Sequence, residues 1–143
     1  MAAPLKAFID LTFDLWMSHR PMASMFRKKA VIVSTAAGAG TKIAIKDVKD
    51  ALFYLGVPKR IPYGIAVQAM NWEQVSEKKK ARIEKDTAAI AKKLNAKKPS
   101  VGIKTRFLFM IMGMMQKKGW SSSPVETAYW KGKGWLDGKK PWN

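Results

Sequence analysis

Cysteine is absent from the 143 residues of this chain, and histidine occurs once, at His19. Without cysteine the protein forms no disulfide framework, no thiolate metal site and no cysteine nucleophile. A single histidine argues against a histidine metal cluster and against a serine–histidine catalytic pair. We therefore expect no metal site in this protein.

Long apolar runs and a leader segment are also missing from the sequence. No run approaches the roughly 20 apolar residues that a membrane-spanning helix needs. No N-terminal segment combines a basic start, an apolar stretch and a small-residue cleavage site. These two absences predict a cytoplasmic protein, and an apolar content of 48% is enough for a globular core.

Acidic residues are scarce, with 10 Asp and Glu against 27 Lys and Arg, which gives a formal net charge of +17. Such a charge attracts polyanions and anionic membrane surfaces through a long-range field. The basic residues are spread along the chain, and several fall on the expected solvated face of a helix. Charge alone therefore defines no site, and nucleic acid or an anionic membrane stays open as a less favoured partner.

The hydrophobic pattern predicts alternating helices and strands. A helix is expected at 4–16, and a strand at 29–35 has the unbroken β-branched run typical of a parallel strand buried on both faces. A helix at 41–55 and a strand at 61–70 follow, and Asn71 is expected to cap a long helix. The apolar stripe of that helix is expected to contain Trp72, Val75, Ile83, Ile90 and Leu94. This alternation predicts an α/β fold built from βαβ units.

The segment AVIVSTAAGAGTK at 30–42 joins the first predicted strand to the following helix. Its small residues lie at the carboxyl end of a parallel strand, where open α/β sheets bind ligands. Small side chains let a flat ligand approach, and free N–H groups at a helix start can face an anion or a polar ring edge. The same residues can serve close packing alone, and the GxGxxG motif is not matched, because only Gly38 and Gly40 occur.

Several motifs together resemble the flavodoxin-like NAD(P)H-dependent FMN reductase family. They are APLKAFID at 3–10, HRP at 19–21, STAAGAGTK at 34–42, LGVPK at 55–59 and QKKGW at 116–120. The resemblance runs through nearly the whole chain. It implies a three-layer fold with a five-stranded parallel sheet, FMN at the C-terminal edge of the strands, and NAD(P)H as electron donor. The flavin would carry the redox chemistry, so no catalytic residue is implied.

The resemblance also implies which residues contact the flavin. In such proteins the loop matching 34–41 lies against the flavin ring, and the segment matching 1–4 lies beside it. The implied cofactor-binding residues are Thr35, Ala36, Ala37, Gly38, Ala39 and Gly40, together with Met1 and Ala2.

The chain also departs from the family pattern. Family members begin with a strand, a phosphate-binding loop and two further strands before the segment that matches Met1. Residues 1–98 therefore resemble the C-terminal part of the domain with its last two strands, and 99–143 form a helical, Trp- and Lys-rich extension packing on it or on a partner subunit. We expect weak FMN binding, marginal stability, and either a homo-oligomer or an N-terminal half supplied in trans.

Two parts of the extension at 99–143, the apolar segment 107–115 and the tail tryptophans, each allow two interpretations. The segment 107–115, apolar on every face, is a membrane-surface helix with Trp120 at the interface or, as we favour, a helix packed within or between subunits. Beyond the loop 121–124, a short helix is expected at 125–131. The tail residues Trp130, Trp135 and Trp142 would either stack on nucleic acid bases or, as we favour, clamp onto the domain. The rival function is thus a non-enzymatic basic protein that binds nucleic acid or an anionic membrane.

Overall fold

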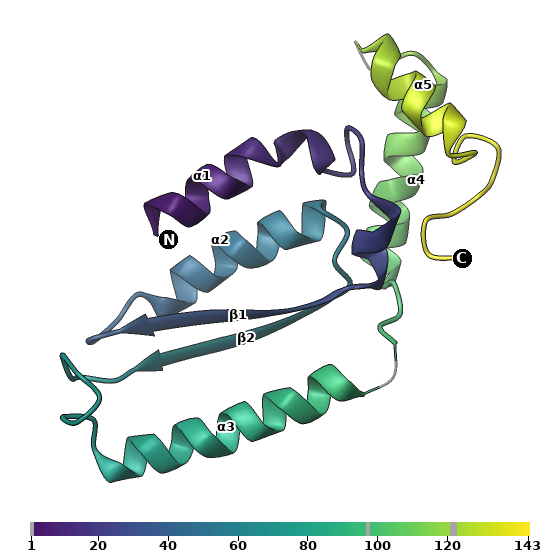
Figure 1. Cartoon of the computed structure of the whole chain (residues 1–143). Coiled ribbons are helices and arrows are strands. Elements are labelled where there is room, and N and C mark those ends of the chain that lie inside the picture. The colour runs from purple at the N-terminus through teal and green to yellow at the C-terminus, as the bar shows by residue number, and fades with distance from the viewer. Residues whose placement is uncertain (1, 97, 121–122) are drawn as a thin grey trace.

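The computed structural model describes residues 2–96, 98–120 and 123–143. These residues form an α/β arrangement of two parallel strands and five α-helices (Figure 1). The α-helices are α1 (Ala3–Leu11), α2 (Thr41–Tyr54), α3 (Glu77–Asn95), α4 (Ile103–Lys117) and α5 (Pro124–Gly132). The strands are β1 (Lys29–Ala36) and β2 (Lys59–Ala66), and short 3-10 helices lie at Phe13–Leu15 and Ala23–Arg27. The predicted α/β class is confirmed.

The two strands and α2 form the predicted βαβ unit. β1 and β2 pair in parallel from Lys29 opposite Lys59 to Ala36 opposite Ala66. α2 connects them and buries Ile45 against the sheet. Gly64 allows this close approach, because a Cβ there would lie 2.9 Å from the Ile45 side chain.

One side of β1 is open to solvent. Ile32 is buried, but Val33 is 63% exposed. The prediction of a strand buried on both faces is therefore wrong. Among the described residues β1 pairs only with β2, so no further strand lies along its other edge.

Two elements end earlier than predicted. α1 stops at Leu11, where Thr12 leaves the helical conformation with φ −101° and ψ 13° and the chain continues into the 3-10 helix at Phe13–Leu15. β2 stops at Ala66, and Gln68 then adopts a left-handed φ of 55° that ends the extended chain.

The long helix begins later than predicted, at Glu77, and Asn71 is not its cap. The Asn71 Oδ1 atom accepts a hydrogen bond from the backbone N–H of Gln74, at 3.1 Å. The Gln74 Oε1 atom accepts one from the backbone N–H of Met70, also at 3.1 Å. These two bonds close a separate turn before α3, so Trp72 and Val75 are not part of the helix, contrary to the prediction.

Two lysines tie α3 to the rest of the domain. The Lys29 ammonium donates to the carbonyl oxygens of Leu94 and Ala96, both at 2.6 Å, at the C-terminal end of the helix. At the other end, the Lys79 ammonium donates to the Val67 carbonyl oxygen at 3.0 Å. A cation at a helix C-terminus is also favoured by the helix dipole.

The largest hydrophobic cluster involves α4, α5 and the tail. Its buried members are Met17, Phe26, Val101, Phe109, Trp130 and Trp135. The centroid of the Phe109 ring lies 5.6 Å from the ring centroid of Phe26 and 4.6 Å from that of Trp130. The indoles of Trp130 and Trp135 are thus buried in this cluster, whereas a domain boundary at residue 98 and the packing of 99–143 on that domain stay predictions.

The C-terminal helices are close to their expected positions. α5 extends one residue beyond each end of the predicted 125–131, while 121–122 of the preceding loop lie outside the described residues. α4 is longer than 107–115, and it is not buried on every side, because Phe107 is 58% exposed. In the described part of the chain, no helix has the length and apolarity to cross a bilayer.

Candidate functional site

An open groove of about 580 Å³ lies between α1, β1 and the start of α2. Figure 1 shows the N-terminal end of α1 lying toward the end of the sheet where the strands finish. The groove is lined by Ala2, Leu5, residues 31–36, Ala39, Gly40, Thr41, Ala44, Ile45 and Val48. It therefore runs along β1 from Val31 to the carboxyl end of the strand, and it includes the position predicted for a ligand.

The structure brings most of the predicted site residues to this groove. The lining includes Ala2, Thr35, Ala36, Ala39 and Gly40. Ala37 and Gly38 belong to the same loop but do not line the groove. Met1 lies outside the described residues.

Backbone hydrogen bonds set the position of the loop. The carbonyl oxygen of Ala36 accepts a bond from the Val67 N–H at 2.9 Å, and that of Ala37 accepts one from the Gln68 N–H at 3.0 Å. Gly40 is the N-cap of α2 with φ 96°, a conformation that glycine adopts without strain. The loop is therefore held against the segment that follows β2, and its shape depends on glycine at position 40.

The groove lining carries no charge and no group that titrates near neutral pH. Its polar side chains are the hydroxyls of Ser34, Thr35 and Thr41, and no side chain caps the first turn of α2. Proton transfer by a side chain needs a titratable group, which this lining does not supply. The groove can accept a neutral, largely apolar molecule.

Sequence reasoning missed the α1 and α2 walls of the groove. Thr41, Ala44, Ile45 and Val48 are spaced as one face of a helix, so the pattern could have identified them together. Leu5 could not be found this way, because it reaches the groove only through the position of α1 in the fold.

His19 does not line the groove. It follows α1 in the sequence and lies against α5. Its Nδ1 atom is 2.8 Å from Oε1 of Glu126 on α5, and the Trp130 indole N–H donates to its carbonyl oxygen at 2.6 Å. Nearby, the Tyr129 hydroxyl donates to the Pro21 carbonyl oxygen at 2.8 Å, and burial raises the pKa of Tyr129. These hydrogen bonds connect the segment after α1 to α5. The contacts of His19 are therefore ones that hold the fold together.

Comparison with known proteins gave no match among family models, curated proteins or solved structures. The function of the chain is therefore argued from the groove and from the sequence motifs that line it.

Proposed function

We propose that this chain is the flavin-facing part of a flavodoxin-like, NAD(P)H-dependent FMN oxidoreductase. The observation that carries the proposal is the position of the loop at residues 35–40. It forms one wall of a neutral groove at the carboxyl end of a parallel strand, where the sequence resemblance puts the flavin ring. When bound, FMN would supply the hydride and electron transfer that the lining residues cannot perform.

The lining residues fit the ring end of such a cofactor. Ala36, Ala39 and Gly40 present little bulk, so a flat ring can approach the backbone. The hydroxyls of Thr35 and Thr41 can hydrogen-bond the polar edge of the ring. The role of this chain is then to hold and orient the ring.

The same lining does not fit the phosphate end, because none of its side chains is positively charged. A phosphate anchor would have to come from another segment, either an N-terminal half supplied in trans or a second copy of the chain. The second edge of β1, which has no paired strand among the described residues, supports such a partner, since an added strand could pair with it. The chain alone is therefore expected to bind flavins weakly and mainly through the ring.

The proposal is tested by flavin fluorescence with two leucine variants of one loop. Ala39→Leu puts bulk on the groove wall, whereas Ala37→Leu changes an exposed residue of the same loop that does not line the groove. We expect quenching of both riboflavin and FMN by the natural chain, unchanged quenching with Ala37→Leu and at least about a tenfold weaker response with Ala39→Leu, a loss of roughly 1.4 kcal/mol.

Riboflavin is included because it lacks the phosphate. Quenching of FMN alone would indicate attraction of the phosphate to the basic surface, and the groove would not be the site. Equal responses of the two leucine variants, or no quenching of either flavin, would also contradict the proposal.

The nucleic-acid alternative receives no support from the tail. Stacking on bases needs accessible indole faces. Trp130 and Trp135 lie in the hydrophobic cluster instead, so neither ring is free to stack.

A further inference from the structure

The outer face of α4 carries an exposed apolar stripe. It consists of Ile103, Phe107, Met110 and Met114, all of them exposed, with Ile103 at 85%. Spacings of four, three and four residues place these side chains on one side of a helix. The opposite side of α4 buries Thr105, Phe109 and Gln116 in the protein. α4 therefore has one face used by the fold and one apolar face left open.

Basic residues border this α4 stripe on both sides. At about 100° per residue, Lys104 and Lys118 fall along one side of the stripe, and Arg106 and Lys117 fall along the other. All four are exposed, and residues 103–118 contain no Asp or Glu. The result is an apolar strip between two cationic rims.

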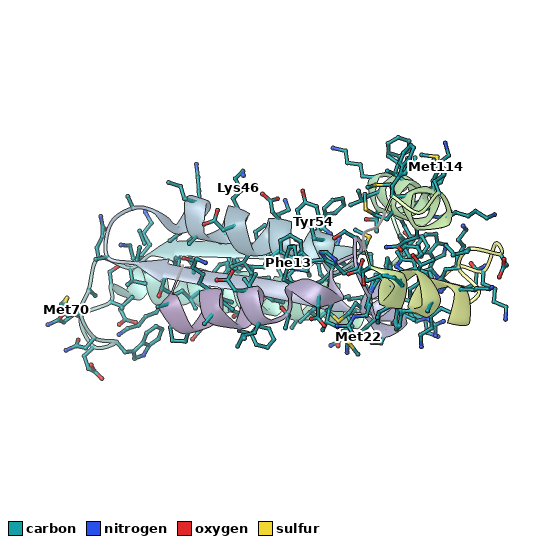
Figure 2. The ribbon with its side chains drawn as sticks, turned by 90° about the horizontal axis from the view of Figure 1, so that it is seen from above. Phe13, Met22, Lys46, Tyr54, Met70 and Met114 are labelled. Carbon is teal, nitrogen blue, oxygen red and sulfur yellow. The ribbon has the colours of Figure 1, made fainter. Side chains whose placement is uncertain are left out.

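Trp120 extends the α4 stripe beyond the end of the helix. Its side chain is 62% exposed, and the Lys118 ammonium lies 4.8 Å from its ring centre. Tryptophan beside a cationic side chain is typical of the boundary between a bilayer and water. In Figure 2, Met114 on α4 lies at the opposite end of the molecule from Met70, which is exposed on the turn before α3.

Charge decides which partner suits this surface. A second copy would bring like-charged rims together across the α4 stripe. α4 has no acidic residue to pair with them, and the pocket that Met110 and Met114 line contains one carboxylate, Asp137. A nucleic acid would match the rims but would leave the apolar side chains against a polar backbone. An anionic lipid surface matches both, because phosphates meet the rims while the stripe enters the boundary of the acyl chains.

We propose that the outer face of α4 is a docking site for an anionic lipid surface. The helix lies flat in the interface, with the α4 stripe inserted and the basic rims among the lipid phosphates. This proposal is independent of the flavin groove, which is lined by α1, β1 and α2.

The test is co-sedimentation of the full chain with vesicles of phosphatidylglycerol and phosphatidylcholine, compared with phosphatidylcholine alone. Met110→Gln/Met114→Gln removes apolar area from the stripe, and Met22→Gln/Met70→Gln makes the same changes at exposed methionines elsewhere. We expect the natural chain and the Met22/Met70 variant to bind the anionic vesicles, and the Met110/Met114 variant to bind about tenfold more weakly. Binding should also fall steeply at about 1 M salt, where the screening length is about 3 Å.

A charge pair completes the design. Lys104→Glu/Lys118→Glu acts on the rims, and Lys85→Glu/Lys92→Glu makes the same change in net charge at exposed lysines of α3. Loss of vesicle binding with the α4 pair but not with the α3 pair supports the proposal. Equal loss of vesicle binding with both pairs overturns it, because the net charge alone would then attract the protein to the vesicles.

Other outcomes also decide against the lipid surface. Vesicle binding unaffected by Met110→Gln/Met114→Gln would overturn the proposal. A dimer in sedimentation that these substitutions dissociate, without vesicle binding, would assign the α4 stripe to a second copy. Salt-sensitive binding to duplex DNA without vesicle binding would assign the rims to nucleic acid.

Discussion

At the residue scale, the single side chain of Trp130 connects parts of the chain that are distant in the sequence. Its side chain is fully buried, its ring lies 4.6 Å from that of Phe109, and its indole N–H donates to the His19 carbonyl oxygen. The partners of that bond are 111 residues apart in the sequence. Loss of the bond would leave a part-buried carbonyl without its donor, which costs more than loss of an exposed bond.

Substituting Trp130 with phenylalanine tests this role. We expect Trp130→Phe to lower the free energy of unfolding by about 1–3 kcal/mol, because the His19 carbonyl oxygen loses its partner. Trp120→Phe is the control, since the exposed Trp120 should change stability by less than about 0.5 kcal/mol. Urea unfolding followed by circular dichroism measures both, and equal midpoint shifts would show that the indole bond contributes little.

At the scale of elements, the helices α2, α3 and α4 differ in the contacts that hold them to the rest of the protein. α2 buries Ile45 and α4 buries Phe109, whereas no residue of α3 is buried. α3 is attached instead by the lysine contacts at its two ends, from Lys29 and Lys79. Apolar burial resists local opening more than exposed contacts do.

Hydrogen exchange should therefore separate these helices. We expect the amides of α3 to exchange at least about tenfold faster than those of α2, because opening α3 exposes little apolar surface. α2 is a suitable control, since it lies on the same sheet and differs in its buried face. Equal protection of the two helices, measured by mass spectrometry of overlapping peptides, would mean that they open as one unit.

Sequence patterns predicted the type of each main element, and they predicted the ends less well. Apolar periodicity located α2, and the unbroken β-branched run located β1, because both signals are local in the sequence. The start of β2 follows from its register with Lys29, and the start of α3 from the turn closed by Asn71 and Gln74. The small-residue loop of the groove was predicted, but its wall at Leu5 depends on tertiary packing that no local pattern contains.

The net charge of +17 acts on the molecule as a whole. Like charges distributed over a small domain repel one another and oppose the compact state. At physiological salt, the screening length of about 8 Å already weakens this repulsion between exposed side chains.

Thermal stability should therefore rise with ionic strength. We expect a higher melting temperature as sodium chloride is raised from about 0.01 M to 0.15 M, because the screening length falls from about 30 Å to 8 Å. Lys85→Glu/Lys92→Glu lowers the charge from +17 to +13, since each change removes two units, and should reduce the salt dependence. A melting temperature that falls with salt would indicate that attractive ion pairs outweigh the repulsion.

The hydrophobic cluster also has a consequence for synthesis on the ribosome. Met17 and Phe26 leave the exit tunnel about 80 residues or more before their partners Phe109, Trp130 and Trp135 are translated. The strands β1 and β2 can pair long before then, while the segment after α1 still has no core to enter. Contacts of such long sequence separation form slowly. The nascent chain therefore exposes an apolar segment until α4 and α5 have been translated, and we expect chaperones to bind that segment during this interval.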